Sequence, residues 1–163
     1  MRAIRTLIAI VFVGSIAATA AAPPTAAQQQ GTRCTIEFKL TASPGLSQQP
    51  SSGPFHTGGE TGTIKCVDGR SGTFGSDGRY GTKDPATCTS GGEGWAVASF
   101  TIGNVNVKDT ETVTFVGMSQ GSLSGKFEGE KLSGNFTFTP TEGDCVNKPL
   151  AKGTIRADAV LKD

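Results

Sequence analysis

Residues 123–138 read LSGKFEGEKLSGNFTF, and this stretch decides the fold class. In both halves apolar or small residues alternate with polar ones, which is the period of two that turns one face of a strand to a core and the other to water. The four residues between the halves, EGEK at 128–131, form a short polar turn. The stretch therefore predicts a β-hairpin.

The same alternation recurs along much of the chain. Six further segments show it: 35–40, 63–66, 73–80, 95–102, 112–115 and 154–161. After the first 27 residues, no stretch of ten or more repeats apolar residues at helical spacing without a glycine interrupting it. We therefore expect a single antiparallel all-β domain of about eight strands. An up-and-down barrel is favoured over a sandwich, because consecutive hairpins lead to a final strand that is long enough to return beside the first.

Residues 1–27 have the features of a secretory signal peptide. Arg2 and Arg5 precede an almost wholly apolar run from Leu7 to Ala18, and small residues with two candidate cleavage sites follow between Ala20 and Ala27. The apolar run is too short to span a bilayer, and nothing later in the chain approaches the required length. The sequence predicts a secreted, extracellular protein or one held at the cell envelope, with no transmembrane segment after signal removal.

The remaining residues, 28–163, are predicted to form the secreted domain. Polar stretches rich in Ser, Pro, Gly or Gln predict a flexible tail at 28–33 and a long loop at 42–59. The chain carries a formal net charge of +1 and only 18% charged residues, without a basic block. Nucleic acid is therefore not an expected partner.

Four cysteines in an exported chain predict two disulfides. Cys34 begins one predicted strand and Cys66 ends the next, so an antiparallel hairpin would bring them to the same end. Cys88 and Cys145 lie in Gly- and Asp-containing loops and would form the second bridge. No C-x-x-C spacing occurs and the chain has one histidine, His56, so we expect no metal site and no cofactor.

The second predicted bridge would gather several carboxylates. Glu142 and Asp144 flank a glycine beside Cys145, and Glu93 follows five residues after Cys88. Paired carboxylates serve as acid and base in glycan hydrolysis and related chemistry, so these three residues are the catalytic candidates. A simpler interpretation is that acidic residues in Gly-rich turns cap backbone amides or face water.

Two aromatic residues near these acids are candidates for ligand binding. Trp95 follows Glu93 closely, and Tyr80 ends the segment 73–80. The phenylalanines instead fall on alternating strand positions, which predicts that they form the core. The string GMSQG at 117–121 matches the G-x-S-x-G motif of serine hydrolases, but hairpin patterns on both sides predict a turn between strands.

Three short motifs carry a resemblance to other proteins. They are GRYGT at 78–82, Cys88 with GGEG at 91–94, and EGDC at 142–145. Over residues 60–150 the chain resembles a group of small secreted bacterial proteins of unknown function. The resemblance implies export and a disulfide-bearing β-domain, and it implies no catalytic activity.

Elimination favours a secreted non-enzymatic β-domain that binds a small apolar ligand or a component of the cell envelope, because the chain has no metal motif or credible nucleophile. The alternative is a secreted carboxylate-dependent enzyme, of glycan hydrolase or isomerase type, built on the acids named above. A second alternative is a surface protein–protein interaction module that uses Lys65, Lys152 and Arg156 on outer strand faces.

Overall fold

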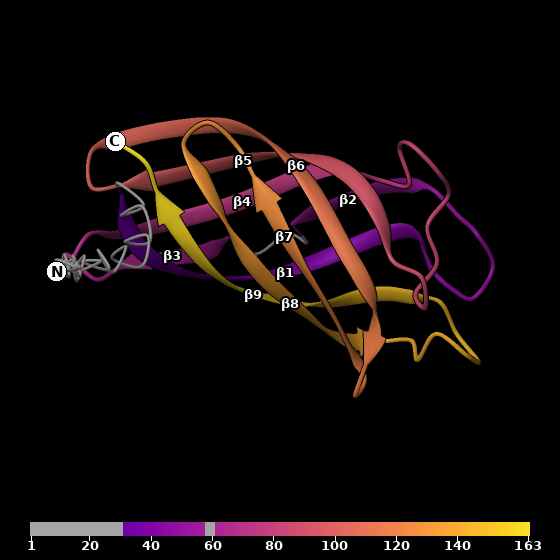
Figure 1. Ribbon diagram of the computed structural model, residues 1–163. Helices are drawn as coiled ribbons and strands as arrows, with labels where there is room; N and C mark the ends of the chain where they lie inside the picture. Colours follow the sequence, from indigo (N-terminus) through magenta and orange to yellow (C-terminus); the bar gives the residue numbers. More distant parts are fainter. Residues whose placement is uncertain (1–30, 58–60) are drawn as a thin grey trace, which may run out of the picture.

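The computed structural model of the protein describes residues 31–57 and 61–163, and all regular secondary structure within them is β-strand (Figure 1). The nine strands are β1 Thr32–Leu46, β2 Gly53–Thr57, β3 Gly62–Cys66, β4 Ser71–Tyr80, β5 Gly92–Ile102, β6 Val105–Ser119, β7 Ser122–Glu128, β8 Leu132–Glu142 and β9 Leu150–Leu161. The described residues accordingly contain no helix that could cross a membrane.

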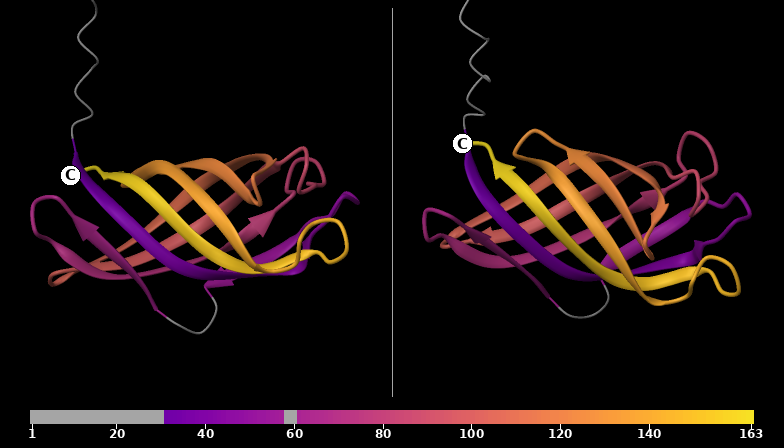
Figure 2. Two further views of the ribbon diagram at one scale, coloured as in Figure 1. Left: turned by 90° about the horizontal axis from the view of Figure 1, so that it is seen from below. Right: turned by 60° about the horizontal axis from the view of Figure 1, so that its bottom comes forward.

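The strands form a closed antiparallel barrel (Figures 1 and 2). From β3 to β9 each strand pairs with the next along the chain, and β9 pairs with β1 from Thr32 opposite Leu161 to Thr41 opposite Lys152. The short strands β2 and β3 both lie between β1 and β4 and together fill one position of the wall. The predicted up-and-down barrel is confirmed, and β2 is the additional strand.

Both predicted disulfides are present. Cys34 lies directly opposite Cys66 in the β1–β3 pair, and their bridge pins these strands together. The other bridge joins Cys88 to Cys145 in two loops that are distant in sequence. The described residues contain no free cysteine.

Two predicted irregular segments are more ordered than their composition indicates. The predicted loop at 42–59 is wrong over much of its length, because β1 continues to Leu46 and β2 begins at Gly53; the connection is only 47–52. The predicted tail at 28–33 is likewise wrong at Thr32 and Arg33, which pair with β9. Neighbouring strands supply the backbone hydrogen bonds that local propensity does not predict. The predicted signal peptide at 1–27, residues 28–30 of the predicted tail and residues 58–59 of the predicted loop lie outside the described residues.

The two ends of the barrel differ. The turn end carries the short connections 67–70, 103–104 and 129–131, together with the beginning of β1 and the end of β9. The loop end carries the connections 47–52, 81–91, 120–121 and 143–149. Gln120 and Gly121 both have positive φ, as a two-residue hairpin turn requires. The G-x-S-x-G string is thus a hairpin turn, as predicted.

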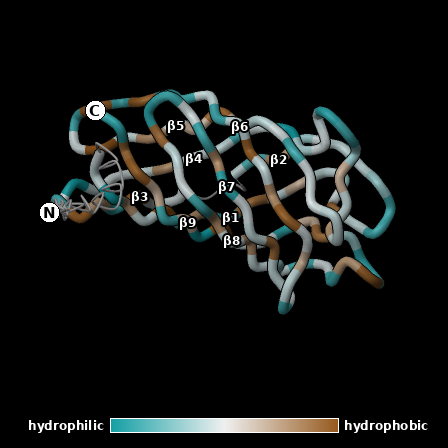
Figure 3. Tube along the Cα trace, in the orientation of Figure 1, coloured by the Kyte–Doolittle hydropathy of each residue, from teal (hydrophilic) through white to brown (hydrophobic). Residues whose placement is uncertain are grey.

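Hydrophobic and hydrophilic residues interleave along the strands (Figure 3). Most of the hydrophobic residues are buried in one core. Phe38, Phe74 and Phe100 form a chain of ring contacts with centroids 5.1 and 6.1 Å apart. The ring of Phe55 on β2 lies against Gly78 on β4, where a side chain would collide with it. This glycine of the three-residue repeat at 69–81 therefore allows β2 to pack into the wall.

Candidate functional site

The barrel interior contains a cavity of about 100 Å³. Every strand except β3 contributes to its lining, and nearly all lining residues are apolar or glycine. The exceptions are Ser76 on β4, Tyr80 at the end of β4, and Glu111 on β6. A concave apolar lining with few polar groups is typical of a small-molecule site.

Tyr80 lines this cavity with its hydroxyl already engaged. The hydroxyl donates a hydrogen bond of 2.6 Å to the carbonyl oxygen of Pro44 and lies 3.3 Å from Oγ of Ser51. Burial raises the pKa of the phenol, so the hydroxyl keeps its proton at neutral pH. Tyr80 thus ties β4 to the end of β1.

Glu111 is the unusual polar residue of the interior. Its side chain is only 4% exposed, and Oε1 is buried without a hydrogen-bond partner among the described residues. Burial, and then the charge of nearby Asp109, raises the pKa of the Glu111 carboxyl to about 8. At neutral pH the group is therefore mostly an uncharged acid whose O–H can donate a hydrogen bond.

Asp109 lies two residues earlier on the same inner face of β6 and is equally buried, at 5% exposed. Its carboxylate accepts backbone N–H bonds from Glu130, Lys131 and Leu132 at 3.1, 2.8 and 2.7 Å. These bonds hold the turn between β7 and β8 against β6. Asp109 therefore has a structural role. The three N–H groups compensate the negative charge of its carboxylate, whereas a negative charge on Glu111 would lack such partners within the described chain.

The alternation of β6 places both acids inside. Val113 and Phe115 face the core, and counting back in steps of two reaches Glu111, Asp109 and Val107. The sequence prediction covered only 112–115 in this strand and missed the acids. The extended alternation was the available signal, because it places two carboxylates on the apolar face.

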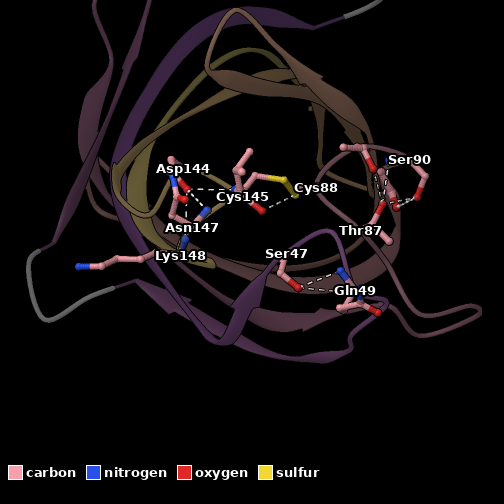
Figure 4. Close-up of a disulfide and its surroundings, with 12 residues drawn as sticks. Ser47, Gln49, Thr87, Cys88, Ser90, Asp144, Cys145, Asn147 and Lys148 are labelled. Atoms are coloured by element: carbon pink, nitrogen blue, oxygen red, sulfur yellow. Dashed lines mark hydrogen bonds between the residues drawn. A yellow bond between two sulfur atoms is a disulfide. The ribbon is translucent and has the colours of Figure 1, made fainter.

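The three acids predicted as catalytic lie elsewhere, at the loop end. Asp144 accepts backbone N–H bonds from Val146, Asn147 and Lys148 and a side-chain bond from Asn147 (Figure 4). These bonds, led by those from Asn147, lower the pKa of the exposed Asp144 carboxyl to about 2. Asp144 is a turn-capping residue, which agrees with the simpler interpretation of the acidic cluster.

The other two predicted acids also face solvent. Glu142 forms an ion pair of 2.8 Å with Lys152, which lowers the pKa of its carboxyl. Glu93 lies 3.8 Å from the ammonium group of Lys83. Each of these acids thus has its own cationic partner, and both are exposed.

The two predicted binding aromatics lie on opposite faces of the wall. Arg79 pairs with Trp95 and Tyr80 with Gly94 in neighbouring strands. Trp95 points outward and is 42% exposed, whereas Tyr80 points into the cavity. Of the two, only Tyr80 contributes to the interior site.

The loop end closes over the barrel. The Cys88–Cys145 bridge lies within the ring of strands when the barrel is viewed along its length (Figure 4), and both cysteines are buried. Backbone hydrogen bonds join Ala86 to Ser51 in both directions and Cys88 to Ser47. The loop 81–91 is thereby fixed across this end.

The hollows found on the outer surface of the described chain are more open than the interior cavity and are lined mostly by polar residues. The large exposed apolar residues come from separate elements: Val67, Trp95, Val105, Val116 and Val146. Lys65, Lys152 and Arg156 are exposed as predicted for an interaction surface, but Lys152 is paired with Glu142. Among residues 31–57 and 61–163, no group of three or more His, Cys, Asp or Glu side chains could hold a metal ion.

Comparison with protein families, with curated proteins and with solved structures finds no match to the chain.

Proposed function

We propose that the protein is an exported, non-enzymatic binding protein that takes up a small apolar molecule inside its barrel. The cavity of about 100 Å³, lined mostly by apolar residues from eight of the nine described strands, carries this proposal. Cavities of about 150 Å³ with such a lining stay dry and bind single aromatic rings or xenon. The expected ligand is therefore about the size of one six-membered ring, well below the size of a drug molecule.

Several features support export. The two disulfides suit an oxidising compartment, where such bridges form and persist. The amino-terminal 27 residues have the charge and hydropathy pattern of a signal peptide. The resemblance to small secreted bacterial proteins points in the same direction.

The two alternatives have less support. A carboxylate-dependent enzyme requires acids that converge in a cleft, and Glu93, Glu142 and Asp144 each interact separately at the surface. A surface interaction module, or docking to an envelope component through an outer face, would call for a contiguous apolar patch. The exposed apolar side chains are instead dispersed.

Ligand titration followed by ¹H–¹⁵N NMR tests the proposed site. The probe is methylenecyclohexane, an uncharged hydrocarbon of the expected size. Ala96→Leu fills the cavity from β5, and Ala157→Leu fills it from β9. Ser99→Leu is the matched control, because it adds a leucine to the outer, exposed face of β5.

We expect saturable binding by the wild type and the Ser99→Leu control, and at least about tenfold weaker binding by each cavity-filling variant, since filling the site removes apolar contact area. The proposal is contradicted if the wild type does not bind the probe. It is equally contradicted if folded Ala96→Leu and Ala157→Leu proteins bind it as well as the wild type does.

A further inference from the structure

Glu111, which lines the cavity, has one polar atom that its surroundings leave unsatisfied. Oε1 of Glu111 is fully buried and has no partner within the described chain, while the Tyr80 hydroxyl is bonded to Pro44. Buried polar groups nearly always have partners, because an unpaired one costs about 1–3 kcal/mol. Because this buried group belongs to the lining of a cavity, its partner can be supplied by a ligand.

The charges around Glu111 determine which partner fits. Within residues 31–57 and 61–163, no Lys, Arg or His side chain lines the cavity. Asp109 on the same strand face is anionic and fully engaged with the β7–β8 turn, whose own charged side chains, Glu130 and Lys131, are exposed. The ammonium group of Lys162, which packs on this turn, donates to the carbonyl oxygen of Gly129. With no cation beside it, Glu111 is best accommodated as the neutral acid.

We propose, resting on the proposed binding function, that the ligand carries a carbonyl oxygen and that the carboxyl O–H of Glu111 donates a hydrogen bond to it. The apolar remainder of the ligand fills the space between the surrounding side chains, such as Phe115, Leu123 and Phe127. Glu111 then selects small ketones, aldehydes or esters over hydrocarbons of the same shape. No bond is made or broken, and the proton stays on the carboxyl group.

A matched pair of probes tests this selection. Cyclohexanone and methylenecyclohexane have nearly the same shape, but the first carries a C=O group where the second carries C=CH₂. Cyclohexylamine is added as a cationic probe. Glu111→Met removes the donor and keeps the length of the side chain, whereas Glu111→Gln keeps a donor that does not titrate. Thr112→Met is the control, because it places the same new side chain on the exposed outer face of β6. Affinities are measured by NMR titration between pH 5 and 9.

We expect Glu111→Met to weaken cyclohexanone binding about tenfold and leave methylenecyclohexane binding no weaker, since one hydrogen bond is lost. Glu111→Gln should bind cyclohexanone like the wild type at pH 6. In the wild type, cyclohexanone affinity should fall above pH 8, where the carboxylate can no longer donate. In Glu111→Gln the affinity should not change with pH.

Two results would overturn the inference while leaving the proposed function intact. The first is binding of both neutral probes with equal sensitivity to Glu111→Met, which would show that the carboxyl group makes no contact with the carbonyl oxygen. The second is tighter binding of cyclohexylamine than of cyclohexanone, with affinity rising towards pH 8, which would assign a cationic ligand. If neither neutral probe binds the wild type, the proposed function itself fails.

Discussion

The protein has two groups of acidic side chains, and they behave in opposite ways. The loop-end group, Glu93, Glu142 and Asp144, is conspicuous in the sequence, yet each member is exposed and has its own partners. The interior pair, Asp109 and Glu111, is inconspicuous in the sequence but buried. The difference teaches that clustered acids in glycine-rich turns are normally satisfied locally, whereas an acid on the inner face of a strand requires a structural or functional explanation.

The interior pair contains the same contrast at closer range. Asp109 is satisfied by three backbone N–H groups of the β7–β8 turn. Glu111, two residues further on, has an oxygen atom with no partner in the part of the chain that the structure describes. Burial alone therefore does not distinguish a structural acid from a candidate binding residue. The number of hydrogen bonds that each carboxyl group accepts distinguishes them.

The largest expected change in stability comes from the loop end, and it should leave the Glu111 carboxyl in the interior unaffected. Replacing Cys88 and Cys145 together by serine should lower the free energy of unfolding by about 4 kcal/mol, because the bridge closes a long loop in the unfolded chain. Urea denaturation measures this change. The Glu111 carboxyl should keep its raised pKa in this variant, since it packs against the β7–β8 turn at the other end. A return of that pKa to about 4.5, the ordinary value, would show that the two regions are coupled.

The next effect comes from the buried acid itself. Folding raises the pKa of the Glu111 carboxyl from 4.5 to about 8. Between pH 4.5 and pH 8 the folded state therefore holds a proton that the unfolded state has released. The stabilising contribution is complete below pH 4.5 and is lost as the pH rises towards 8. We expect the stability of the wild type to fall, relative to Glu111→Gln, by about 3 kcal/mol between pH 4.5 and pH 7.

Thermal and urea unfolding of both proteins across this pH range measure the difference. Glu128→Gln, at an exposed position near the end of β7, is the control for removing one carboxylate. Parallel stability curves for wild type and Glu111→Gln would show that Glu111 titrates normally in the folded protein.

The smallest effect compares two turn-capping carboxylates. Asp109→Ala should destabilise the protein by about 2 kcal/mol, because it leaves N–H groups without an acceptor, including the buried one of Leu132. Asp144→Ala removes a carboxylate that also accepts three backbone N–H bonds, but water can replace it at the surface, so its loss should be smaller. Urea denaturation measures the free energy of unfolding of both variants. Equal losses of stability would show that burial of the N–H groups does not determine the cost of removing the carboxylate.

Much of the fold could be predicted from the sequence. Period-two alternation located eight strand segments, and the position of Cys34 and Cys66 at the same end of a hairpin predicted their bridge. Strand β2 was missed because GPFHT is short and contains proline and glycine, and its pairing depends on β1 and β4 rather than on local propensity.

The candidate site was harder to predict. Glu111 stands among polar residues in KDTET, and the prediction for this strand began one residue after it. Its face could be inferred by extending the alternation, but its lack of a partner depends on neighbours from other strands. The cavity also depends on how all the strands pack, so one sequence could predict a barrel but not whether its interior was hollow.

The central claim is that the interior of the barrel, rather than the acidic loop end, is the binding site. Intermolecular NOEs between bound cyclohexanone and the protein test it most directly. We expect NOEs from the probe to Leu123 and Ile155, which line the cavity on opposite sides of β8. NOEs confined to exposed groups at the loop end, such as Val146 and Trp95, would contradict the account.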